Sequence, residues 1–317
     1  MDEKILKILR THRDKFTSAE ELARRVSLSK PTLARHISKL GDEGYDIQHQ
    51  PHLGYKLVGL PDRLAASEVK WQLNTKIIGR KVLSYNVVDS TNTTAFSLAR
   101  QGAPCGTAVF AEGQKKGRGR RGRGWVSPTS KGIYLSLVLR PHISSNEASL
   151  ITLLAAASCA ESIRSVCGLK ALIRWPNDIL VNNKKVCGIL TEIETEGNRV
   201  KFIILGIGIN VERSKLPPEA GTLRKETKRD FSRLDLAREL LQHLDKHYRN
   251  FERRGAEDLI REWKNLSAFS GRRVKVFLAH KTIEGQAQDI DDEGALIVRL
   301  DSGFREHVTS ADIVKIR

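Results

Sequence analysis

The sequence predicts an α+β protein built from three successive parts. Residues 1–60 hold short apolar stripes at helical spacing, followed by alternating residues typical of a hairpin. Residues 65–269 alternate β-branched runs with longer helical stretches, and residues 270–317 hold short β-rich runs between Asp/Gly turns. A chain of 317 residues is long enough for two or three domains, each with its own core.

The first part has the pattern of two short helices joined by a tight turn. Ser18 and Glu21 form a capping box at the start of one helix, and Ser29 with Pro31 begins the second. Residues 46–58 then predict a two-stranded wing with its turn at 49–53. This is a helix-turn-helix pattern, which favours DNA binding. The alternative is that the domain mediates contacts with another protein. The residues expected to face DNA from the second helix are Lys30, Thr32, Arg35, His36 and Lys39.

The central and last parts are predicted element by element from hydrophobic periodicity. We expect strands at 82–88, 107–111, 133–139, 171–175, 178–181, 186–194 and 200–210, and helices at 93–100, 147–167 and 234 to about 266. The polar stretch 212–230, with its prolines and glycines, predicts a surface loop. From residue 271 onward the short strands predict a small barrel.

The segment Gly117–Trp125 places four arginines and four glycines in nine residues. So many glycines make an ordered helix or strand costly, so we expect a mobile loop. Its guanidinium groups repel one another unless an anion lies among them, and arginine offers a planar fork of donors to phosphate oxygens. The loop therefore predicts a clamp for an adenylate, a triphosphate or pyrophosphate. A solvated or RNA-binding Arg-Gly segment is the alternative, but the position between two predicted strands argues against it.

Two common nucleotide motifs are excluded. Gly117, Gly119 and Gly122 match the spacing GxGxxG, but no helix follows and the acidic residue expected about 20 positions later is missing. The chain also has no GxxxxGK[ST] sequence. We therefore expect a nucleotide to be held by arginines and strand-end loops.

Three further segments carry polar groups near predicted strand ends. Arg174–Asp178 brings a cation and two polar groups to a strand end, and Ser90–Asn92 lies at a strand-to-helix junction. Gly206–Asn210 places glycines inside a β-branched run, which often marks the close approach of a ligand or another backbone. Each segment also has a purely structural explanation. Arg174–Asp178 can be a turn, Ser90–Asn92 a helix N-cap, and Gly206–Asn210 an ordinary strand. Lys184 and Lys185 are by themselves typical of a solvated turn.

Charge and cysteine usage narrow the class of protein. The net charge is +17, and residues 113–131 alone hold seven Lys/Arg and no acid, so the strongest local field lies on the basic loop. Four cysteines without CxxC spacing predict neither a disulfide framework nor a metal site, and they fit a reduced cytoplasm. The apolar run at 148–160 is shorter than the roughly 18 residues of a membrane span, which predicts a buried helix and no membrane association.

Taken in order, these segments resemble the bacterial family of bifunctional biotin–protein ligases and biotin-operon repressors. The resemblance runs over nearly the whole chain and is carried by Asp89–Asn92, Gln114 with Gly117–Trp125, Arg174–Asp178, Lys184–Glu192 and Gly206–Asn210. Lipoate ligases share the fold but lack this basic loop. The resemblance implies a winged helix-turn-helix at 1–60, a class II synthetase-like biotin/lipoate ligase fold at 65–269 and an SH3-like β-barrel at 270–317.

The resemblance implies two activities. The first is a ligase that forms biotinyl-5′-AMP from biotin and ATP with Mg²⁺, and transfers biotin to a lysine of a biotin carboxyl carrier protein. The second is a cytoplasmic repressor of biotin genes that binds operator DNA as a homodimer, with biotinyl-5′-AMP as corepressor. A ligand-sensing regulator without ligase activity and a lipoate-type ligase are the alternatives. No tightly bound metal is expected.

The resemblance also implies roles for individual residues. Biotin contacts are expected from Ser90, Thr91, Asn92, Gln114, Arg118, Gly119, Arg120, Lys185 and Gly188. The ATP and magnesium side is expected at Arg121, Trp125, Asn177 and Asn210. The expected catalytic residues are Arg118, Arg120, Lys185 and Asp178, the last of which is expected to deprotonate or orient the acceptor lysine. Arg174 stands where the family usually has lysine, so a fork of donors replaces a compact ammonium.

Overall fold

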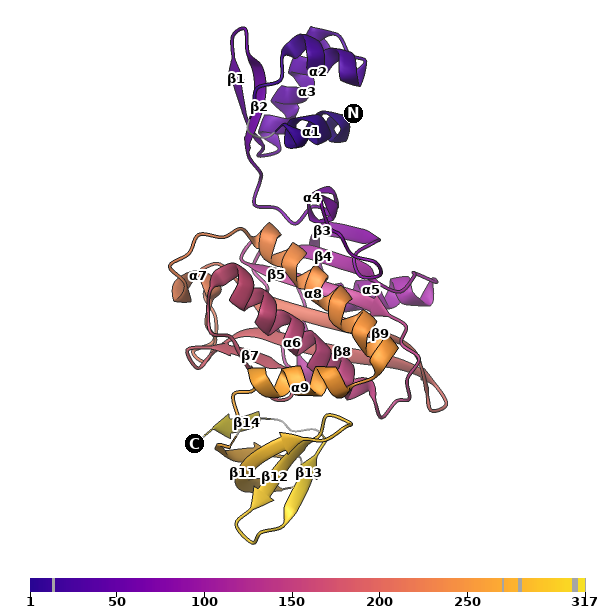
Figure 1. Cartoon of the computed structure of the whole chain (residues 1–317), viewed down its shortest axis with the longest axis vertical. Helices are drawn as coiled ribbons and strands as arrows, with labels where there is room; N and C mark the ends of the chain where they lie inside the picture. Colours follow the sequence, from indigo (N-terminus) through magenta and orange to yellow (C-terminus); the bar gives the residue numbers. More distant parts are fainter. Residues whose placement is uncertain (13–14, 270, 279–280, 310–312, 317) are drawn as a thin grey trace. The chain divides into compact units, whose positions relative to one another are not determined.

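The computed structural model describes residues 1–12, 15–269, 271–278, 281–309 and 313–316 (Figure 1). The chain divides into two compact units, residues 1–63 and residues 64–317. The C-terminal residues therefore belong to the same unit as the central part, and the expected domain boundary at residue 270 lies outside the described residues. Each unit is described by itself below.

The first unit consists of helices that end in a hairpin: α1 (Asp2–Thr11), α2 (Ala19–Val26), α3 (Lys30–Asp42), β1 (Asp46–Gln50) and β2 (Gly54–Gly59). Both predicted caps form, since Ser18 Oγ accepts a hydrogen bond from the Glu21 backbone N–H at 3.2 Å and Ser29 Oγ accepts one from Thr32 at 3.4 Å. Apolar residues of all three helices and of β2 share one core. The predicted helix-turn-helix with a wing is confirmed.

The second unit is organised around a seven-stranded mixed sheet. The strand order across the sheet is β3 (Val82–Val88), β4 (Thr107–Gln114), β5 (Gly132–Leu139), β9 (Arg199–Asn210), β8 (Lys184–Glu196), β7 (Asp178–Val181) and β6 (Leu172–Arg174). Strands β3 and β4 are parallel, and the other neighbours are antiparallel. All eight residues of the interior strand β5 are buried, as expected for a strand with both faces covered.

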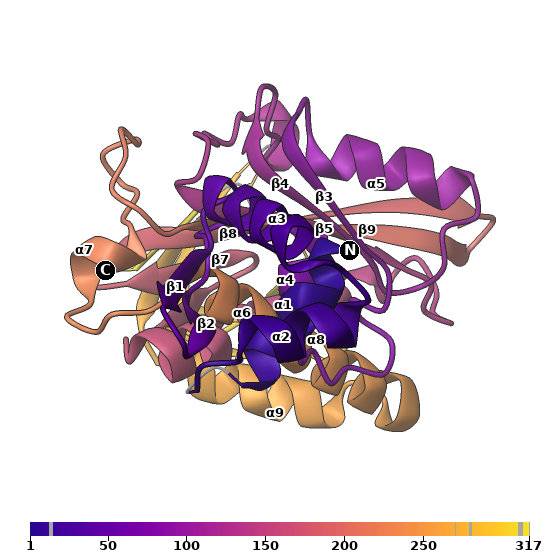
Figure 2. The ribbon, with the colours of Figure 1, turned by 90° about the horizontal axis from the view of Figure 1, so that it is seen from above.

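Helices cover the two faces of this sheet unequally (Figures 1 and 2). On one face Thr152 of α6 (Ala148–Cys167) lies 2.7 Å from Thr191 of β8, oxygen to oxygen. On the other face Asn92 of α5 (Thr91–Arg100) donates to Glu192 of β8 at 2.7 Å. Successive strand residues point to opposite faces, so α6 and α5 lie on opposite sides. The helices α8 (Arg233–Arg254) and α9 (Glu257–Leu266) pack against α6, and the short helix α4 (Ala66–Lys70) packs against α8.

Two predictions for the segments after the sheet are wrong in detail. The helix expected from 234 to about 266 is two helices, because the chain turns at Gly255, whose φ of 73° is a conformation that favours glycine. The stretch 212–230 is not purely a surface loop. It contains the short helix α7 (Leu223–Glu226), and the Leu223 side chain is fully buried.

The apolar helix α6 forms at the predicted place, within one residue of the expected range 147–167. It runs for 20 residues, and within the described part of the chain it alone has the length and composition of a membrane span. Its most apolar window is 72% buried inside the protein. Burial against the sheet and α8, and not its length, therefore identifies it as the core helix.

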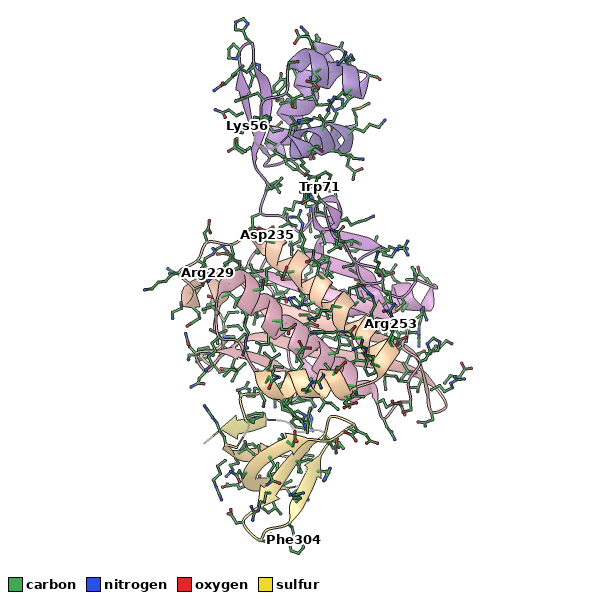
Figure 3. The ribbon with its side chains drawn as sticks, viewed as in Figure 1. Lys56, Trp71, Arg229, Asp235, Arg253 and Phe304 are labelled. Carbon is green, nitrogen blue, oxygen red and sulfur yellow. The ribbon has the colours of Figure 1, made fainter. Side chains whose placement is uncertain are left out.

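The C-terminal part is a five-stranded antiparallel sheet. Its strand order is β13 (Arg305–Val308), β12 (Leu296–Leu300), β11 (Thr282–Ile290), β10 (Arg273–Phe277) and β14 (Ile313–Ile316). It is attached to the central part by the β11–β12 turn, where the Trp175 indole N–H donates to the Gly294 carbonyl at 3.0 Å. At the turn between β12 and β13, the exposed Phe304 side chain projects away from the body of the protein (Figure 3).

A buried ion pair supports the base of the basic loop. Arg233 has no exposed surface, and its Nη2 lies 2.9 Å from Oε2 of Glu112 near the end of β4. The other carboxylate oxygen accepts from the Leu64 backbone N–H at 2.7 Å. The strand that leads into residues 117–125 is thus fixed to α8 by a buried charge pair.

Candidate functional site

A cavity of about 470 Å³ opens on the α5 face of the central sheet. The cavity is lined by the start of α5, the end of β4, the basic loop, the turn between β6 and β7, strands β8 and β9, and residues 216–220. The expected site residues that line it are Ser90, Thr91, Asn92, Gln114, Arg118, Gly119, Arg120, Trp125, Asn177, Asp178, Lys185, Gly188 and Asn210. Arg121 does not line the cavity; it is exposed and has a left-handed φ of 54°.

One end of the cavity is a network of neutral polar groups. Ser136 Oγ lies 2.8 Å from Thr91 Oγ1 and 2.6 Å from Asn92 Oδ1. Gln114 Oε1 accepts from the Thr91 backbone N–H at 2.8 Å, while Gln114 Nε2 donates to Ser127 at 2.8 Å. Thr91, Asn92 and Gln114 are therefore held in place by one another. Ser136 was not among the predicted site residues, and its signal in the sequence is one serine inside the apolar strand β5.

Ser90 occupies the N-cap position of α5, but its side chain makes no capping hydrogen bond. It is 3% exposed and lines the same end of the cavity as Thr91 and Asn92. The helix-cap explanation of Ser90–Asn92 is thus incomplete, because a capping hydroxyl would bond to the N–H of the second or third helical residue. The arrangement leaves the Ser90 hydroxyl available to a polar group in the cavity.

Glycines on β8 and β9 form the floor of the cavity. Gly188 and Gly208 are cross-strand partners, and the Trp125 indole lies over both. A Cβ atom on Gly208 would fall 2.4 Å from Trp125 Nε1, and one on Gly206 would fall 2.1 Å from Asn92 Oδ1. The predicted close approach is real, but side chains make it and not a backbone. The Trp125 indole N–H is buried there without a hydrogen-bond acceptor.

A charged cluster forms where strands β6, β7 and β8 meet. Asp178 lies between two cations, with Oδ2 at 2.7 Å from Arg174 Nη2 and Oδ1 at 2.6 Å from Lys185 Nζ. Lys185 is also 5.4 Å from the centre of the Trp125 ring, close enough for a cation–π contact. Lys185 therefore belongs to the cavity and is no solvated turn residue, whereas its exposed neighbour Lys184 donates to the Pro218 carbonyl.

The side chains that line the cavity carry an excess of positive charge. Five are cationic and two are acidic: Arg118, Arg120, Arg123, Arg174 and Lys185 against Asp178 and Glu219. Such an excess in a concave site favours an anionic ligand. Arg123 lies within the arginine run that predicted an anion clamp, but it was not among the individually predicted site residues.

The basic loop is more regular than predicted. It contains a single turn of 3₁₀ helix at Arg120–Gly122 and an isolated bridge between Arg118 and Gly124. Arg118 Nη2 lies 2.8 Å from Glu192 Oε2, and Arg120 donates to Asn177 Oδ1 at 3.4 Å. The expected repulsion between guanidinium groups is thus reduced by oxygens of the sheet. Glu192 accepts from both Arg118 and Asn92, although it was not among the predicted site residues.

Residues 216–220 form a wall that the sequence did not predict. Leu216, Pro217, Glu219 and Ala220 line the cavity, and the Lys185 backbone N–H donates to the Glu219 carbonyl at 3.1 Å. This contact ties the wall to the strand that carries Lys185. The prolines and polar residues of this stretch predict a loop, but they do not predict that the loop packs against the strand that carries Lys185.

The expected DNA-facing residues all lie on α3 in the first unit, but several of them pair with neighbouring side chains. Asp2 of α1 pairs with two of them, with Oδ1 at 2.6 Å from His36 Nδ1 and Oδ2 at 2.6 Å from Lys39 Nζ. The hydrogen bond from Lys39 lowers the pKa of Asp2; burial opposes this shift, and His36 adds a further lowering.

The remaining members of this set also have partners within the unit. Lys30 pairs with Glu20 of α2, and Arg35 Nη2 donates to Thr32 Oγ1 at 3.3 Å. Lys30 and Lys39 keep 58% and 60% of their side-chain surface exposed, so DNA could still reach them. The basic face of α3 is therefore partly neutralised by acids of α1 and α2.

Comparison with known proteins places these features in one group. Family profiles match three segments: biotin/lipoate A/B protein ligase at residues 84–210, biotin protein ligase C-terminal domain at 269–315 and a helix-turn-helix domain at 2–56. The bifunctional ligase/repressor BirA of Bacillus spizizenii is 35% identical over 304 residues, which cover 94% of this chain and 93% of that protein.

Two further comparisons agree. BirA of Escherichia coli K12 is 33% identical over 292 residues, covering 90% of this chain and 89% of that protein. Among solved structures, the biotin protein ligase of Aquifex aeolicus in complex with biotin and ATP is 26% identical with a TM-score of 0.64, covering 75% of this chain and 99% of that chain.

Proposed function

We propose a function from one premise: the chain belongs to the family of bifunctional biotin ligase/repressors. It is a biotin protein ligase with a helix-turn-helix repressor domain. One structural observation carries the ligase assignment. A single cavity has neutral hydroxyl and amide groups at one end and five cationic side chains along its wall and floor. That polarity suits a neutral ureido ring joined by an aliphatic chain to a carboxylate and phosphates.

The reaction has two steps. The carboxylate of biotin attacks the α-phosphorus of ATP, which forms biotinyl-5′-AMP and releases pyrophosphate. An amine of the acceptor lysine, on a biotin carboxyl carrier protein, then attacks the acyl carbon and AMP leaves. Charge develops on phosphate oxygens in the first step, so fixed cations lower its barrier.

We assign the ureido ring to the end of the cavity at Ser90, Thr91, Asn92 and Gln114. Support comes from the Ser90 hydroxyl, which is not used as a cap, and from the network that fixes its neighbours. The bare floor at Gly188 leaves room for an aliphatic chain beneath Trp125. This division places the biotin carboxylate beside Lys185.

Lys185 is assigned to the biotin carboxylate and the α-phosphate, and Arg174 acts beside it. Both oxygens of Asp178 already face these two cations at 2.6 and 2.7 Å. A carboxylate held in this way is better suited to position Lys185 and Arg174 than to accept a proton. We therefore propose that Asp178 is a positioning residue for the cations, which modifies the sequence-based hypothesis of a base.

The basic loop is assigned to retention of the adenylate. Arg118, Gly119 and Arg120 line the cavity beside the charged cluster, and Arg118 is held by Glu192. A mixed anhydride is reactive toward water, so a loop that covers it protects the intermediate. Trp125 and Asn177 are placed on the nucleotide side, and the exposed Arg121 contributes to the positive field outside the cavity.

Mg²⁺ is proposed to accompany ATP. Asn177 and Asn210 bring neutral side-chain oxygens to the cavity, and oxygen is the ligand atom that Mg²⁺ prefers. Asp178 is already engaged by two cations, so the protein residues fit an ion that keeps several waters and binds mainly through phosphates. Bound to ATP, the ion supplies charge neutralisation at the phosphates.

The repressor activity is proposed to depend on biotinyl-5′-AMP as corepressor and on a homodimer. A palindromic operator requires two copies of the recognition helix α3. The segments at 117–125 and 216–220 both line the cavity, so a bound adenylate contacts surface loops from two parts of the sheet. We propose that these loops form the dimer surface once the adenylate is present. Four free thiols support a location in the reduced cytoplasm.

The ligase assignment is tested by exchange of labelled pyrophosphate into ATP. We expect exchange with biotin and ATP, and none with lipoate or octanoate in place of biotin. Exchange supported by lipoate would show a lipoate-type ligase, and no exchange with either acid would show a regulator without catalysis. Mobility shifts with operator DNA, with and without biotin plus ATP, test the corepressor; equal DNA affinity in both conditions contradicts it.

A further inference from the structure

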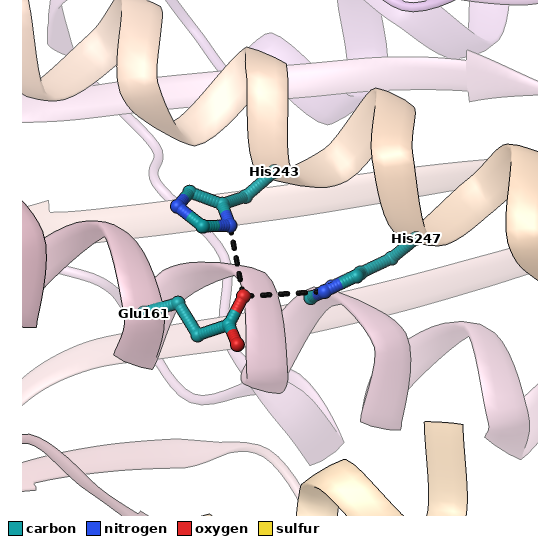
Figure 4. A group of neighbouring side chains, drawn as sticks. All are labelled: Glu161, His243 and His247. Carbon is teal, nitrogen blue, oxygen red and sulfur yellow. Dashed lines mark ion pairs between the residues drawn. The ribbon is translucent and has the colours of Figure 1, made fainter. Parts of the chain in front are cut away.

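A second group of ionisable side chains lies among the helices, away from the cavity (Figure 4). Glu161 comes from α6, His243 and His247 come from successive turns of α8, and Glu262 comes from α9. The helix α6 covers the sheet face opposite to α5, whereas the cavity opens on the α5 face. The ligase reaction as proposed uses none of these four residues.

Three nitrogen and oxygen atoms of this group converge without hydrogen bonding to one another. Glu161 Oε2 lies 2.8 Å from His243 Nδ1 and 3.2 Å from His247 Nε2. All three atoms are buried, and none has a hydrogen-bond partner of acceptable geometry. Buried polar atoms normally make hydrogen bonds, whereas these three meet only as ion pairs, an arrangement that a cation between them would satisfy.

The hydrogen bonds of Ser158 fix which ring nitrogen of His247 carries the proton when the ring is neutral. The Ser158 hydroxyl donates its single hydrogen to the Leu154 carbonyl at 2.8 Å. Ser158 Oγ must then accept from His247 Nδ1, which lies 2.9 Å away. A neutral His247 consequently directs the lone pair of Nε2 at the carboxylates, which repel it. A histidine that binds a metal ion through one ring nitrogen usually donates a hydrogen bond from its other ring nitrogen to a neighbouring group.

The carboxylates favour a cation at the same point. Glu262 Oε2 lies 3.0 Å from His247 Nε2, and Glu239 Oε1 lies 3.3 Å from the other ring nitrogen of His243. The group thus brings carboxylate oxygens and imidazole nitrogens from three helices to one partly buried point.

We propose that Glu161, His243 and His247 bind one Zn²⁺ ion, with Glu262 beside the fourth coordination position. Their ligand atoms lie within 4.8 Å of one another. Imidazole nitrogen and carboxylate oxygen are the donors that Zn²⁺ accepts at about 2.1 Å, so tetrahedral ligands lie roughly 3.4 Å apart. Binding therefore requires the two contacts of Glu161 to open by about 0.6 and 0.2 Å.

The site joins three helices, which indicates a structural ion. Glu161, His243 and Glu262 lie on α6, α8 and α9, and their side chains are 20–31% exposed, so an ion has a route from solvent. Cysteine spacing in the sequence predicts no metal site. The pattern that does signal this one is His-x-x-x-His, which puts both imidazoles on one face of a helix.

The test uses the full-length protein after chelation and removal of the chelator. We expect one equivalent of Zn²⁺, displaceable by a chromophoric chelator, and a melting temperature raised by about 5 °C at a hundredfold excess over Kd. Co²⁺ in place of Zn²⁺ should give the visible absorption of a tetrahedral site without a thiolate charge-transfer band. Absence of a bound equivalent, or a thiolate band, overturns the proposal.

Variants locate the ion. His243→Gln and Glu161→Gln should each lose the bound equivalent and the thermal shift, while pyrophosphate exchange is retained. The matched control is His142→Gln, since His142 is 90% exposed with a carboxylate 3.9 Å away at Glu252. Retention of one equivalent in His243→Gln contradicts the site. If a variant is less stable, its retained exchange activity shows that it is folded.

Discussion

The ammonium of Lys185 lies 2.6 Å from Oδ1 of Asp178 at the floor of the cavity. This contact holds the cation where the biotin carboxylate and the α-phosphate are proposed to meet. A substrate anion therefore competes with Asp178 for the same ammonium. The two residues lie on β7 and β8 of one hairpin, although the sequence by itself indicated a solvated turn at Lys185.

Lys185→Met should abolish most adenylate formation. Loss of one preorganised charge-stabilising group costs about 10²- to 10³-fold in the chemical step. The measurement is burst formation of biotinyl-5′-AMP from labelled ATP. Lys184→Met is the matched control, because Lys184 is exposed and its ammonium donates to the Pro218 carbonyl outside the charged cluster. Normal adenylate formation in Lys185→Met contradicts the assignment.

Glu192→Gln should release the adenylate faster without blocking its synthesis. Glu192 Oε2 accepts from Arg118 at 2.8 Å and from Asn92 at 2.7 Å, so the change weakens the attachment of the basic loop. A hydrogen bond to a charged group is worth about 1.5–3 kcal/mol, or roughly 10- to 100-fold in retention. Release is measured by chasing labelled adenylate with unlabelled biotin.

The control for this change is Glu194→Gln, two residues along the same strand. Glu194 pairs with Arg100 of α5 at 3.0 Å, and neither residue lines the cavity. We expect its adenylate retention to equal that of the unmodified protein. Equal release rates for both variants count against a role of the Arg118–Glu192 pair.

Glu112→Gln should destabilise the second unit strongly. The change leaves the fully buried Arg233 without the carboxylate 2.9 Å away. Removal of one partner of a buried pair costs about 3–5 kcal/mol in the free energy of unfolding. Urea unfolding followed by tryptophan fluorescence measures it. Asp301→Asn, which removes the exposed partner of Arg273, should change stability little.

The first unit should lose stability in acid through Asp2. Its pKa is lowered in the folded protein, chiefly by the hydrogen bond from Lys39. The stabilisation is therefore present above the ordinary pKa of 3.8 and disappears as pH falls through the lower folded value. Amide exchange of residues 2–11, measured across this range, should rise in acid. Asp2→Asn should be less protected at neutral pH and should show a smaller acid dependence.

The same substitution should strengthen DNA binding. Asp2→Asn releases Lys39 and His36 from a competing carboxylate on the predicted DNA-facing helix. If Lys39 contacts a phosphate, the salt dependence of binding should steepen by about one unit. Fluorescence anisotropy with duplex DNA at several salt concentrations measures this. The control is Glu21→Gln, which changes the net charge by the same amount but removes a partner of Arg25. If this variant strengthens DNA binding equally, the effect of Asp2→Asn comes from net charge alone.

Much of the fold followed from local pattern. The caps at Ser18 and Ser29 and the strands on both sides of the basic loop form as predicted, because capping and side-chain alternation act over a few residues. The wrong predictions fall where packing against another segment determines the local structure. The break at Gly255 and the burial of Leu223 depend on what each segment packs against.

By itself, the sequence determined the order of elements, the arginine-rich loop and the group of strand-end residues that form the cavity. Tertiary structure alone decided which groups meet there: Ser136 with Asn92, Arg118 with Glu192, Asp2 with Lys39, and Glu161 with two histidines. Each pair is separated by tens of residues in the chain. Such contacts are set by strand pairing and helix packing, since burial fixes which distant side chains share a space. Local periodicity records which face of an element is apolar, but not which partner lies against it.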